Sequence, residues 1–561
     1  MPLGWLGWII VTVAISLLQR VLGVALRPKS KAPDHTQPTS EAGGIIPVFY
    51  GVVELAPNTT WTGHFLKRSV DQYWRFYGAA HHIFCFGKVN ELIDLSWDEK
   101  SARNHHLTHP SSHSTATPPV LQGPLLNNGA PYFVDIHGDY AAKRKEAGSM
   151  FGGNRQGGGV AGGFKIYWGT DAQSADGYLS LSEAYGSSFV SRWPRICYIR
   201  QGGGTPTAAG VDGGAASQAD GGDRPFYLGA NTSTPYPLRA VLRRTGWWET
   251  ATSPLGQTEQ EATLGYDANP AEVLYDLLTN AVYGLGRSAA RMDLQSFIDA
   301  AVALRNETVD ASVPGVKRGF GISLIINTPI EAGSILRDIL DTIDASLATN
   351  PLTGLYRLKL IRDDYVVATL PVISSSNSWE FVYRPSTWAD TYNEVRLTYN
   401  RFVNTTERRG FVEDIASAQD GANWQATGRI RTLTLDARLI TDPDVARLKC
   451  ERARRAHGIP LARCSWKMNR EGYTLMQGDV VSADPAAFGV SDLILRITRI
   501  NYGALDDGTI EVEAMQDVFN VGSAVYTAPP ESGWVEPPAD VDDDPDSSLD
   551  YPVPDWGTET N

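Results

Sequence analysis

The clearest hydrophobic pattern of the chain lies in residues 267–286, DANPAEVLYDLLTNAVYGLG. Four apolar residues recur there at helical spacing and share one face: Leu274, Leu277, Leu278 and Ala281. Asp267 or Asn269 can accept from the exposed N–H groups of a first turn, and Pro270 suits the first helical position because it lacks an N–H. Gly286 follows, and glycine tolerates the left-handed geometry that ends many helices. The pattern predicts a capped helix and implies no catalysis.

The segments before this helix have the patterns of strands. Ile45–Val53 is an apolar run rich in β-branched and aromatic residues, which is typical of a buried strand. Asp71–Val89 is densely aromatic and predicts a pair of strands in a barrel core. Further strands are predicted at Phe164–Trp168 and Leu238–Trp248. Two glycine-rich stretches, at 154–163 and 201–223, predict loops between them.

The segments after this helix mix helical and strand patterns. Two more helices are predicted from apolar residues at helical spacing: Leu294, Phe297, Ile298, Ala301 and Leu304 in one, and Ile335, Leu336, Ile339, Leu340 and Ile343 in the other. Asp293 is the expected N-cap of the first, and Gly319–Ile326 between them is strand-like. Leu355–Ile361 and Tyr365–Leu370 suggest a hairpin across Arg362–Asp364. Alternation in Thr391–Asn400 predicts a strand with Asn393, Val395, Leu397 and Tyr399 buried and Glu394, Arg396 and Thr398 in water.

The C-terminal third contains a basic helix and a group of strands. Thr441–Arg455 is predicted as a helix with Thr441 or Asp442 as its cap and Pro443 in its first turn. Five basic residues surround most of it: Arg447, Lys449, Arg452, Arg454 and Arg455. They indicate either a solvated helix or a surface that binds acidic protein or exiting DNA. Strands are predicted at Gly478–Ala483 and Leu493–Ile500, with a hairpin turn at Asp506–Gly508 leading into Glu511–Phe519.

The length of 561 residues exceeds what one hydrophobic core can hold, and the 54 glycines and 33 prolines indicate many turns. The predicted fold class is therefore α+β and β-rich, with several small β-barrel or sandwich domains and a few packed helices. The predicted divisions are an apolar N-terminal segment (1–27), a linker (28–44), a β-rich region with glycine-rich insertions (45–266), a helix-containing α+β region (267–400), a β-rich region with the basic helix (401–525) and an acidic, proline-rich tail (526–561).

The net charge of −14 is concentrated at the C-terminus. Residues 528–561 carry ten Asp and Glu and no Lys or Arg, so the rest of the chain has a net charge of only −4. The chain therefore lacks the basic surplus that would indicate DNA as its main ligand. The tail is too poor in apolar residues to fold alone. It is either a solvated tail or a partner-binding peptide anchored by Trp534, Tyr551 and Trp556.

The N-terminal run Leu3–Leu18 is almost entirely apolar, and its flanking charges, Arg27, Lys29 and Lys31, follow it rather than precede it. A signal peptide has the opposite order. Three interpretations remain: a signal anchor, a core helix of an assembly, or a segment buried against partner chains inside a tube.

No catalytic, cofactor-binding or metal-ligating residues are predicted. His105, His106, His109 and His113 form the one histidine cluster, but Pro110 and the surrounding Ser and Thr predict a loop, where helical spacing is lost. The glycine-rich stretch 154–163 lacks the Lys–Ser/Thr pair of a phosphate-binding loop. Cys85, Cys197, Cys450 and Cys464 are far apart without a CxxC pair, so neither a disulfide framework nor a zinc site is expected.

Four blocks resemble the tail tip hub (J-like) family of phages with long non-contractile tails. They are Ile45–Trp61, the NPAxxxYxxLTNxxYGxG pattern that begins at Asn269, Thr391–Asn400 and Gly508–Asn520, and they occur in the family's order. Tyr167–Asp171 and Gly478–Val481 are also similar to tail-hub motifs. The resemblance implies tail-tube-like hub domains in a homotrimer that closes the distal end of the tail tube. It implies a virion structural protein of the tail tip or baseplate, assembled in the host cytoplasm, and no enzyme.

The same resemblance implies the partners of the chain. They are the tape-measure protein, the distal tail and tube proteins, and tail fibre or receptor-binding proteins that serve host attachment. Phage DNA would pass during ejection, and residues 1–27 could contact the host membrane. The chain stops soon after Asp517–Phe519, so receptor binding is expected to belong to a separate partner.

Two other functions remain as alternatives. A cell-wall hydrolase of the tail tip would need two carboxyl groups at a defined separation, one of them with a raised pKa, and no recognised motif supplies them. A membrane-anchored envelope protein would use the apolar N-terminal segment.

Overall fold

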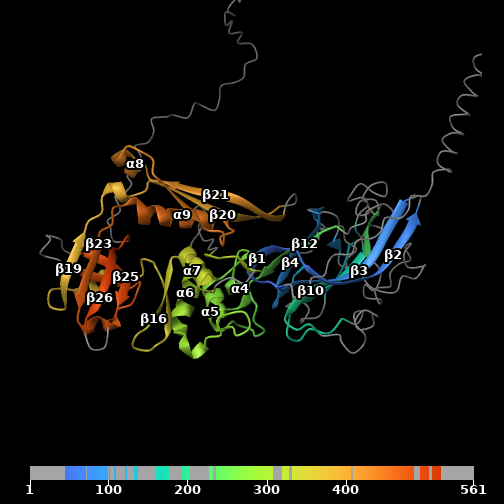
Figure 1. Cartoon of the computed structure of the whole chain (residues 1–561), viewed down its shortest axis with the longest axis horizontal. Helices are drawn as coiled ribbons and strands as arrows, with labels where there is room; N and C mark the ends of the chain where they lie inside the picture. The colour runs from blue at the N-terminus through green and yellow to red at the C-terminus, as the bar shows by residue number, and fades with distance from the viewer. Residues whose placement is uncertain are drawn as a thin grey trace, which may run out of the picture.

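The computed structural model describes residues 45–70, 73–98, 100–101, 107–108, 121–122, 132–136, 160, 162–176, 192–202, 226–230, 236–307, 319–327, 332–405, 409–484, 493–503 and 508–519. These residues form β-rich units and a helical unit that follow one another along the long axis of the molecule (Figure 1). The predicted α+β, β-rich fold class is therefore confirmed. The segments 1–27 and 28–44, the four histidines between 105 and 113, and the tail 526–561 lie outside the described residues.

The first unit is a sandwich of two sheets. One sheet has the order β15 (Leu324–Ile326), β1 (Val48–Leu55), β12 (Leu238–Arg244), β4 (Glu91–Trp97) and β5 (Lys100–Ser101), with β7 (Leu121–Gln122) on β4. The other has the order β11 (Phe226–Ala230), β3 (Tyr73–Phe86), β10 (Ile196–Gln201), β9 (Gly162–Trp168), β8 (Tyr132–Ile136) and β6 (Leu107–Thr108), with β2 (Asn58–Val70) on β3. Apolar side chains of both sheets share one core, in which the rings of Trp97 and Phe226 stack with their centres 5.8 Å apart.

Two strand predictions in this unit need correction. Asp71–Val89 does not hold a pair of strands, because its aromatic residues belong to the single strand β3, whose partner β2 lies upstream. The strand predicted to run to Trp248 stops at Arg244, where the chain turns toward the helices. The strands predicted at Ile45–Val53 and Phe164–Trp168 are confirmed as β1 and β9.

The middle unit holds the helices. Its elements are α4 (Glu259–Ala262), β13 (Thr263–Leu264), β14 (Asp267–Ala268), α5 (Pro270–Thr279), η4 (Ala289–Arg291), α6 (Leu294–Asn306), α7 (Ala332–Ile343), β16 (Ala345–Thr349) and β17 (Tyr356–Leu360). Asn269 caps α5 by accepting from the N–H of Ala271, and Pro270 opens the helix, as predicted. However, α5 ends at Thr279, so Ala281 is exposed and does not belong to the apolar face.

The predicted hairpin between Leu355–Ile361 and Tyr365–Leu370 is wrong. Strand β17 pairs with β16, which precedes it, and the second segment contains the short 3-10 helix η5 (Val367–Thr369). Val366 and Val367 are exposed, so this apolar run does not pack as a strand of the unit.

A three-stranded sheet lies over the middle unit. Its order is β21 (Arg409–Gln419), β20 (Glu394–Asn404) and β22 (Thr432–Asp436), and its elements are accompanied by η6 (Trp388–Asp390), α8 (Gly421–Thr427) and α9 (Pro443–Gly458). Strand β20 shows the predicted alternation, except that Glu394 is buried. Helix α9 packs along β20 and β21 and starts at the predicted cap, Asp442, whose side chain accepts from two N–H groups.

The last unit is a six-stranded sheet that curls around its own apolar core. Its order is β18 (Val372–Ile373), β24 (Val480–Ala483), β25 (Leu493–Asn501), β26 (Ile510–Gln516), β23 (Arg463–Met468) and β19 (Ser378–Arg384), and η7 (Arg470–Thr474) follows β23. The strands predicted from Gly478, Leu493 and Glu511 are confirmed as β24, β25 and β26. Residues 506 and 507 of the predicted turn lie outside the described residues.

Gly51 permits a close contact between β1 and the segment that leads into β15. Its φ is +74°, and a Cβ atom there would lie 2.2 Å from Oγ of Ser323 and 2.7 Å from the carbonyl oxygen of Ile322. Only glycine therefore fits this position in β1 without displacing the neighbouring backbone. The next residue, Val52, donates its N–H to the Ser323 hydroxyl at 2.9 Å, which fixes β1 against the segment that leads into β15.

Candidate functional site

Arg244, the last residue of β12, is the most deeply buried cation at the joint between the sandwich and the helices. Its guanidinium donates to the carbonyl oxygen of Phe49 at 2.7 Å and lies 5.1 Å from the ring centre of Tyr50 and 5.7 Å from that of Trp247. It also contacts the hydroxyl of Tyr283 at 3.4 Å. The aromatic faces and the carbonyl replace the water that the cation loses on burial.

Asp276 of α5 completes this cluster. Its carboxylate accepts from the hydroxyl of Tyr50 at 2.5 Å and from that of Tyr283 at 2.7 Å. Burial, followed by the charge of Asp276, raises the pKa of Tyr50, and burial raises the pKa of Tyr283 to about 12. Both hydroxyls therefore stay protonated and donate, so the cluster connects β1, β12 and α5 through two hydrogen bonds to the Asp276 carboxylate and one buried cation.

Asp267 forms a second buried contact between distant parts of the chain. It is buried in β14 and accepts from the hydroxyls of Ser323 at 2.5 Å and Thr441 at 2.6 Å. These three residues come from the middle unit, the segment before β15 and the segment before α9. One carboxyl group thus holds together parts of the chain that are far apart in sequence.

Asp267 and Glu272 are carboxyl groups whose pKa is raised to about 7, in both cases chiefly by burial. Hydroxyl donors oppose the shift: Ser323 and Thr441 for Asp267, and Ser253, at 2.5 Å, for Glu272. A carboxyl group with a raised pKa is what a hydrolase would require of its acid. Each of the two, however, is only 2% exposed, and neither lines the cavity described below. We assign them to packing.

These raised pKa values predict that the protein loses stability as the pH rises. The folded state keeps both carboxyls protonated up to about pH 7, whereas the unfolded chain loses those protons near pH 4. Unfolding therefore releases protons between about pH 4 and 7, and each unit of pKa difference costs about 1.4 kcal/mol once the pH exceeds the folded pKa. The double variant Asp267→Asn, Glu272→Gln mimics the protonated side chains. We expect a flatter dependence of the midpoint temperature on pH from 5 to 8 than in the wild type.

The matched control is Asp299→Asn, which removes an exposed carboxylate from α6. It should keep the wild-type dependence on pH. Calorimetry of the three proteins at intervals of half a pH unit measures the slopes. A double variant with the wild-type slope would show that these two groups are not the source of the dependence.

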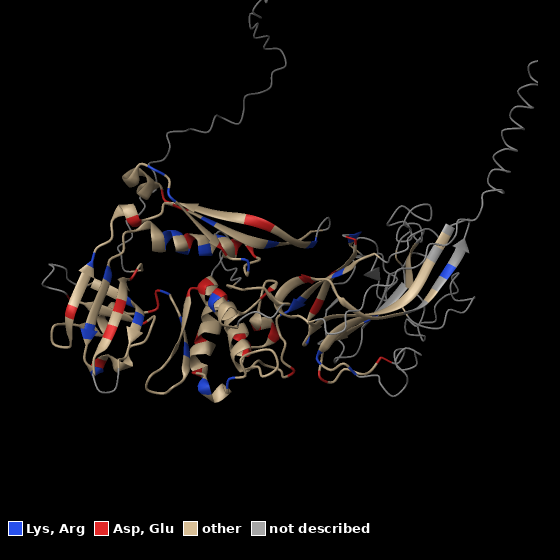
Figure 2. Ribbon diagram, in the orientation of Figure 1, with Lys and Arg blue, Asp and Glu red and all other residues tan. Residues whose placement is uncertain are grey.

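The basic residues of α9 are largely paired within the chain. Lys449 bonds to Asp344, Arg452 bonds to Glu307, and Arg454 contacts Asp420 at 2.8 Å. Arg362 also contacts Glu307, at 3.0 Å. Figure 2 shows several Lys and Arg positions, in blue, along α9. Helix α9 is thus solvated only in part, because Lys449 is buried while Arg447 and Arg455 are exposed. The paired cations are engaged within the chain rather than open to an acidic partner.

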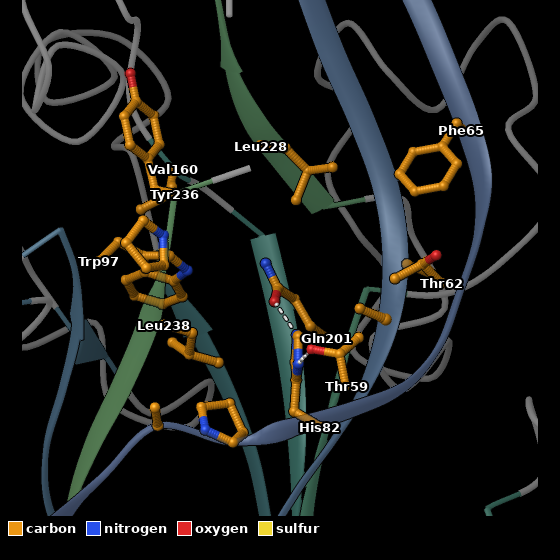
Figure 3. A pocket seen from close by; sticks show the side chains of 15 residues that line it. Thr59, Thr62, Phe65, His82, Trp97, Val160, Gln201, Leu228, Tyr236 and Leu238 are labelled. Carbon is orange, nitrogen blue, oxygen red and sulfur yellow. Dashed lines mark hydrogen bonds between the residues drawn. The ribbon is translucent and has the colours of Figure 1, made fainter. Parts of the chain in front are cut away.

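A cavity of about 310 Å³ lies between the two sheets of the sandwich. Its wall is mainly apolar, with Phe65, Trp97, Leu228 and Leu238 among the lining residues, and it carries no carboxylate (Figure 3). Gln201 and Thr59 flank His82 on this wall. Oε1 of Gln201 lies 2.9 Å from Nε2, and the hydroxyl of Thr59 lies 3.0 Å from Nδ1.

His82 is held as a neutral ring. An amide oxygen only accepts, so Nε2 carries the proton and Nδ1 accepts from Thr59. Burial lowers the pKa of His82 to about 4. Both ring nitrogens are occupied, and no carboxylate lies on the wall to exchange a proton with, so the cavity suits an apolar group better than a reaction.

Residues at the far end of the three-stranded sheet expose large apolar side chains. Trp388 in η6, Trp424 in α8 and Ile430 after α8 are between 47% and 63% exposed. We call these three residues the tryptophan patch. The buried Asn423 donates to Thr391 at 2.7 Å, and Asn393 donates to the carbonyl oxygen of Arg429 at 2.7 Å, which fixes η6, α8 and the loop beyond them together.

Sequence reasoning placed no function on this patch. Asn393 was predicted to be buried, but its hydrogen bond to the loop after α8 could not be predicted, because no pattern indicated α8.

Among the described residues no three His, Cys, Asp or Glu side chains gather in a geometry that could hold a metal ion. The described helices also include none that is both long and apolar enough to cross a membrane.

Comparison with known proteins gives one match to a family. Residues 331–500, from α7 to β25, match the family Phage-tail_3, described as "Putative phage tail protein". No curated protein gives a significant match. The match confirms the resemblance to phage tail proteins, which are components of the tail of the virion. The tryptophan patch, α9 and most of the last unit lie within the matched residues.

Among solved structures the chain is similar to a protein of the virion of a native gene transfer agent particle, with 14% identity and a TM-score of 0.42, over 91% of this chain and 96% of that one. It is also similar to the 43 kDa tail protein of prophage MuSo2 from Shewanella oneidensis, with 13% identity and a TM-score of 0.25, over 36% of this chain and 59% of that one. Both TM-scores are below 0.5, and we base no conclusion about fold or function on these two similarities.

Proposed function

We propose that this chain is the structural hub of a phage tail tip, which closes the distal end of the tail tube as a homotrimer. The observation that carries the proposal is the family match over residues 331–500, together with the ordered hub-like blocks from Ile45 to Asn520. The clusters around Arg244 and Asp267 support a structural role, because their buried charged and polar groups bond to parts of the chain that are far apart in sequence.

The proposed partners would bind the exposed surfaces that the contacts within the chain leave open. The tryptophan patch is exposed apolar surface on a rigid base, as expected of a site that docks another tail protein. The proposed occupants of the hub surfaces are the tube and distal tail proteins, the tape-measure protein and a fibre or receptor-binding protein. The apolar segment 1–27 is proposed to lie inside the assembly, and phage DNA to pass the hub during ejection.

Two measurements test the proposal. Immunogold labelling of intact particles with antibodies against this chain should mark one end of the tail, opposite the head. Light scattering of the purified full chain should give a mass three times 61.1 kDa. Labels spread along the whole tail would instead indicate a tube protein, and particles without any label would contradict the assignment to the virion.

A further inference from the structure

Two of the four cysteines lie side by side in the sandwich. Cys85 on β3 and Cys197 on β10 are direct partners in the antiparallel register. The register shifts immediately beyond this pair, between Cys197 and Tyr198, so the two strands depart from a regular ladder there. Nothing in the spacing of the cysteines along the sequence indicates this neighbourhood.

The geometry of the pair fits a disulfide. Facing residues of antiparallel strands have Cα atoms about 4.5–5.5 Å apart, and disulfides bridge Cα atoms about 4.4–6.8 Å apart. Both side chains point into the same core, both are buried, and the Cys197 thiol hydrogen-bonds with that of Cys85. The two sulfur atoms can therefore be joined with the strand register unchanged.

The surroundings also determine how readily the pair reacts. The hydrogen bond with Cys85, followed by burial, raises the pKa of Cys197, so its unreactive thiol form dominates in the closed core. Reaction with an oxidant therefore requires local opening of the core, because both side chains are buried.

We propose that Cys85 and Cys197 are a dithiol that a small-molecule disulfide oxidises to a cross-strand disulfide, which locks β3 to β10. This inference does not depend on the hub assignment. One thiolate attacks the oxidant, here glutathione disulfide, and forms a mixed disulfide while one glutathione leaves. The second cysteine then attacks the protein sulfur and releases a second glutathione. The dithiol loses two hydrogens, and the oxidant is reduced to two thiols.

A disulfide between Cys85 and Cys197 would close the long segment between β3 and β10 into a covalent loop. The closed loop contains β4 to β9, so its constraint on the unfolded chain is large. A particle assembled in a reducing cytoplasm and released into an oxidising medium would acquire the lock after assembly.

The test uses the purified full chain, fully reduced and then incubated with glutathione disulfide under native conditions. We expect the loss of two titratable thiols, a peptide map that links Cys85 to Cys197, and a midpoint temperature raised by about 5 °C or more. Cys450→Ser, Cys464→Ser keeps the pair and removes the other cysteines, which lie on α9 and β23, so it should behave like the wild type. Cys85→Ser should show no rise in midpoint temperature.

Three results would overturn the proposal. They are four thiols that remain free after prolonged oxidation, a persistent glutathione adduct on either cysteine, and a linkage other than Cys85–Cys197. The peptide map of the wild type decides between these outcomes even if Cys85→Ser fails to fold.

Discussion

Replacing Arg244 with methionine is expected to lower the free energy of unfolding by about 3–5 kcal/mol, a loss typical of a broken buried polar network. The side chain is 1% exposed, and its removal leaves the carbonyl oxygen of Phe49 without its 2.7 Å donor. The substitution also removes the cation from between Tyr50, Trp247 and Tyr283, whose rings surround it. Methionine fills part of the space but offers no donor, so the loss comes from unpaired polar groups rather than from an empty cavity.

Calorimetric and urea unfolding of the full chain measure this effect. Arg239→Met is the matched control because it lies on the same strand, is half exposed and forms only a surface ion pair with Glu54 at 3.3 Å. It should change stability by less than about 1 kcal/mol. Arg244→Lys keeps the positive charge but loses the planar guanidinium group with its several N–H donors. We expect a loss of unfolding free energy between those of Arg239→Met and Arg244→Met. Equal stability of Arg244→Met and Arg239→Met would show that the contacts of Arg244 with the surrounding aromatic rings contribute little to the free energy of unfolding.

The local elements were predictable where the sequence signal is itself local. Helix α5 begins at the residues that the capping pattern named, because an Asn side chain and a following proline act within one turn. Strand β20 shows the predicted alternation because one of its faces lies on the core and the other in water. Ala281 was assigned wrongly, since periodicity continues past the point where the helix stops at Thr279.

Pairing between distant segments was not predictable from the same patterns. Leu355–Ile361 has the residues of a strand, but whether it pairs forward or backward depends on the turn before it, and it pairs with β16. Arg244 looked like an ordinary strand residue, since its burial is created by rings from β1, Trp247 and the loop after α5. The contact of Cys85 with Cys197 likewise depends on the register of β3 and β10, which no single stretch encodes.

The candidate interaction surface was missed for the same reason. The alternation predicted that Asn393 is buried but not that its amide supports a loop beneath Trp388 and Trp424. Exposed tryptophans in an extended or irregular stretch have no period that distinguishes them from core residues. Their exposure becomes evident only when η6 and α8 are placed at the end of the three-stranded sheet (Figure 1).

The double variant Trp388→Ser, Trp424→Ser is expected to abolish incorporation of the protein into particles while leaving its fold intact. Buried tryptophans at the centre of an interface typically contribute at least about 2 kcal/mol each, so two of them correspond to roughly a thousandfold weaker binding if their effects add. Both side chains are about half exposed in the single chain, so their loss lowers the midpoint temperature but leaves the cores of the units untouched. The buried amides of Asn393 and Asn423 remain to hold η6 and α8 in place.

Complementation distinguishes a docking defect from a folding defect. Phage that lack the gene are supplied with the wild-type or the variant protein, and particles are counted by electron microscopy and by plaque titre. Val282→Ser is the matched control, because Val282 is 66% exposed but lies in the turn after α5, away from the patch. The control should restore the titre fully, whereas the double variant should leave unjoined tails or heads although the purified variant is still folded at the temperature of the assay. A double variant that restores the titre would mean that the hub meets its partners elsewhere, and the open edge of β19, which carries the exposed Trp379 and Val382, would become the next surface to change.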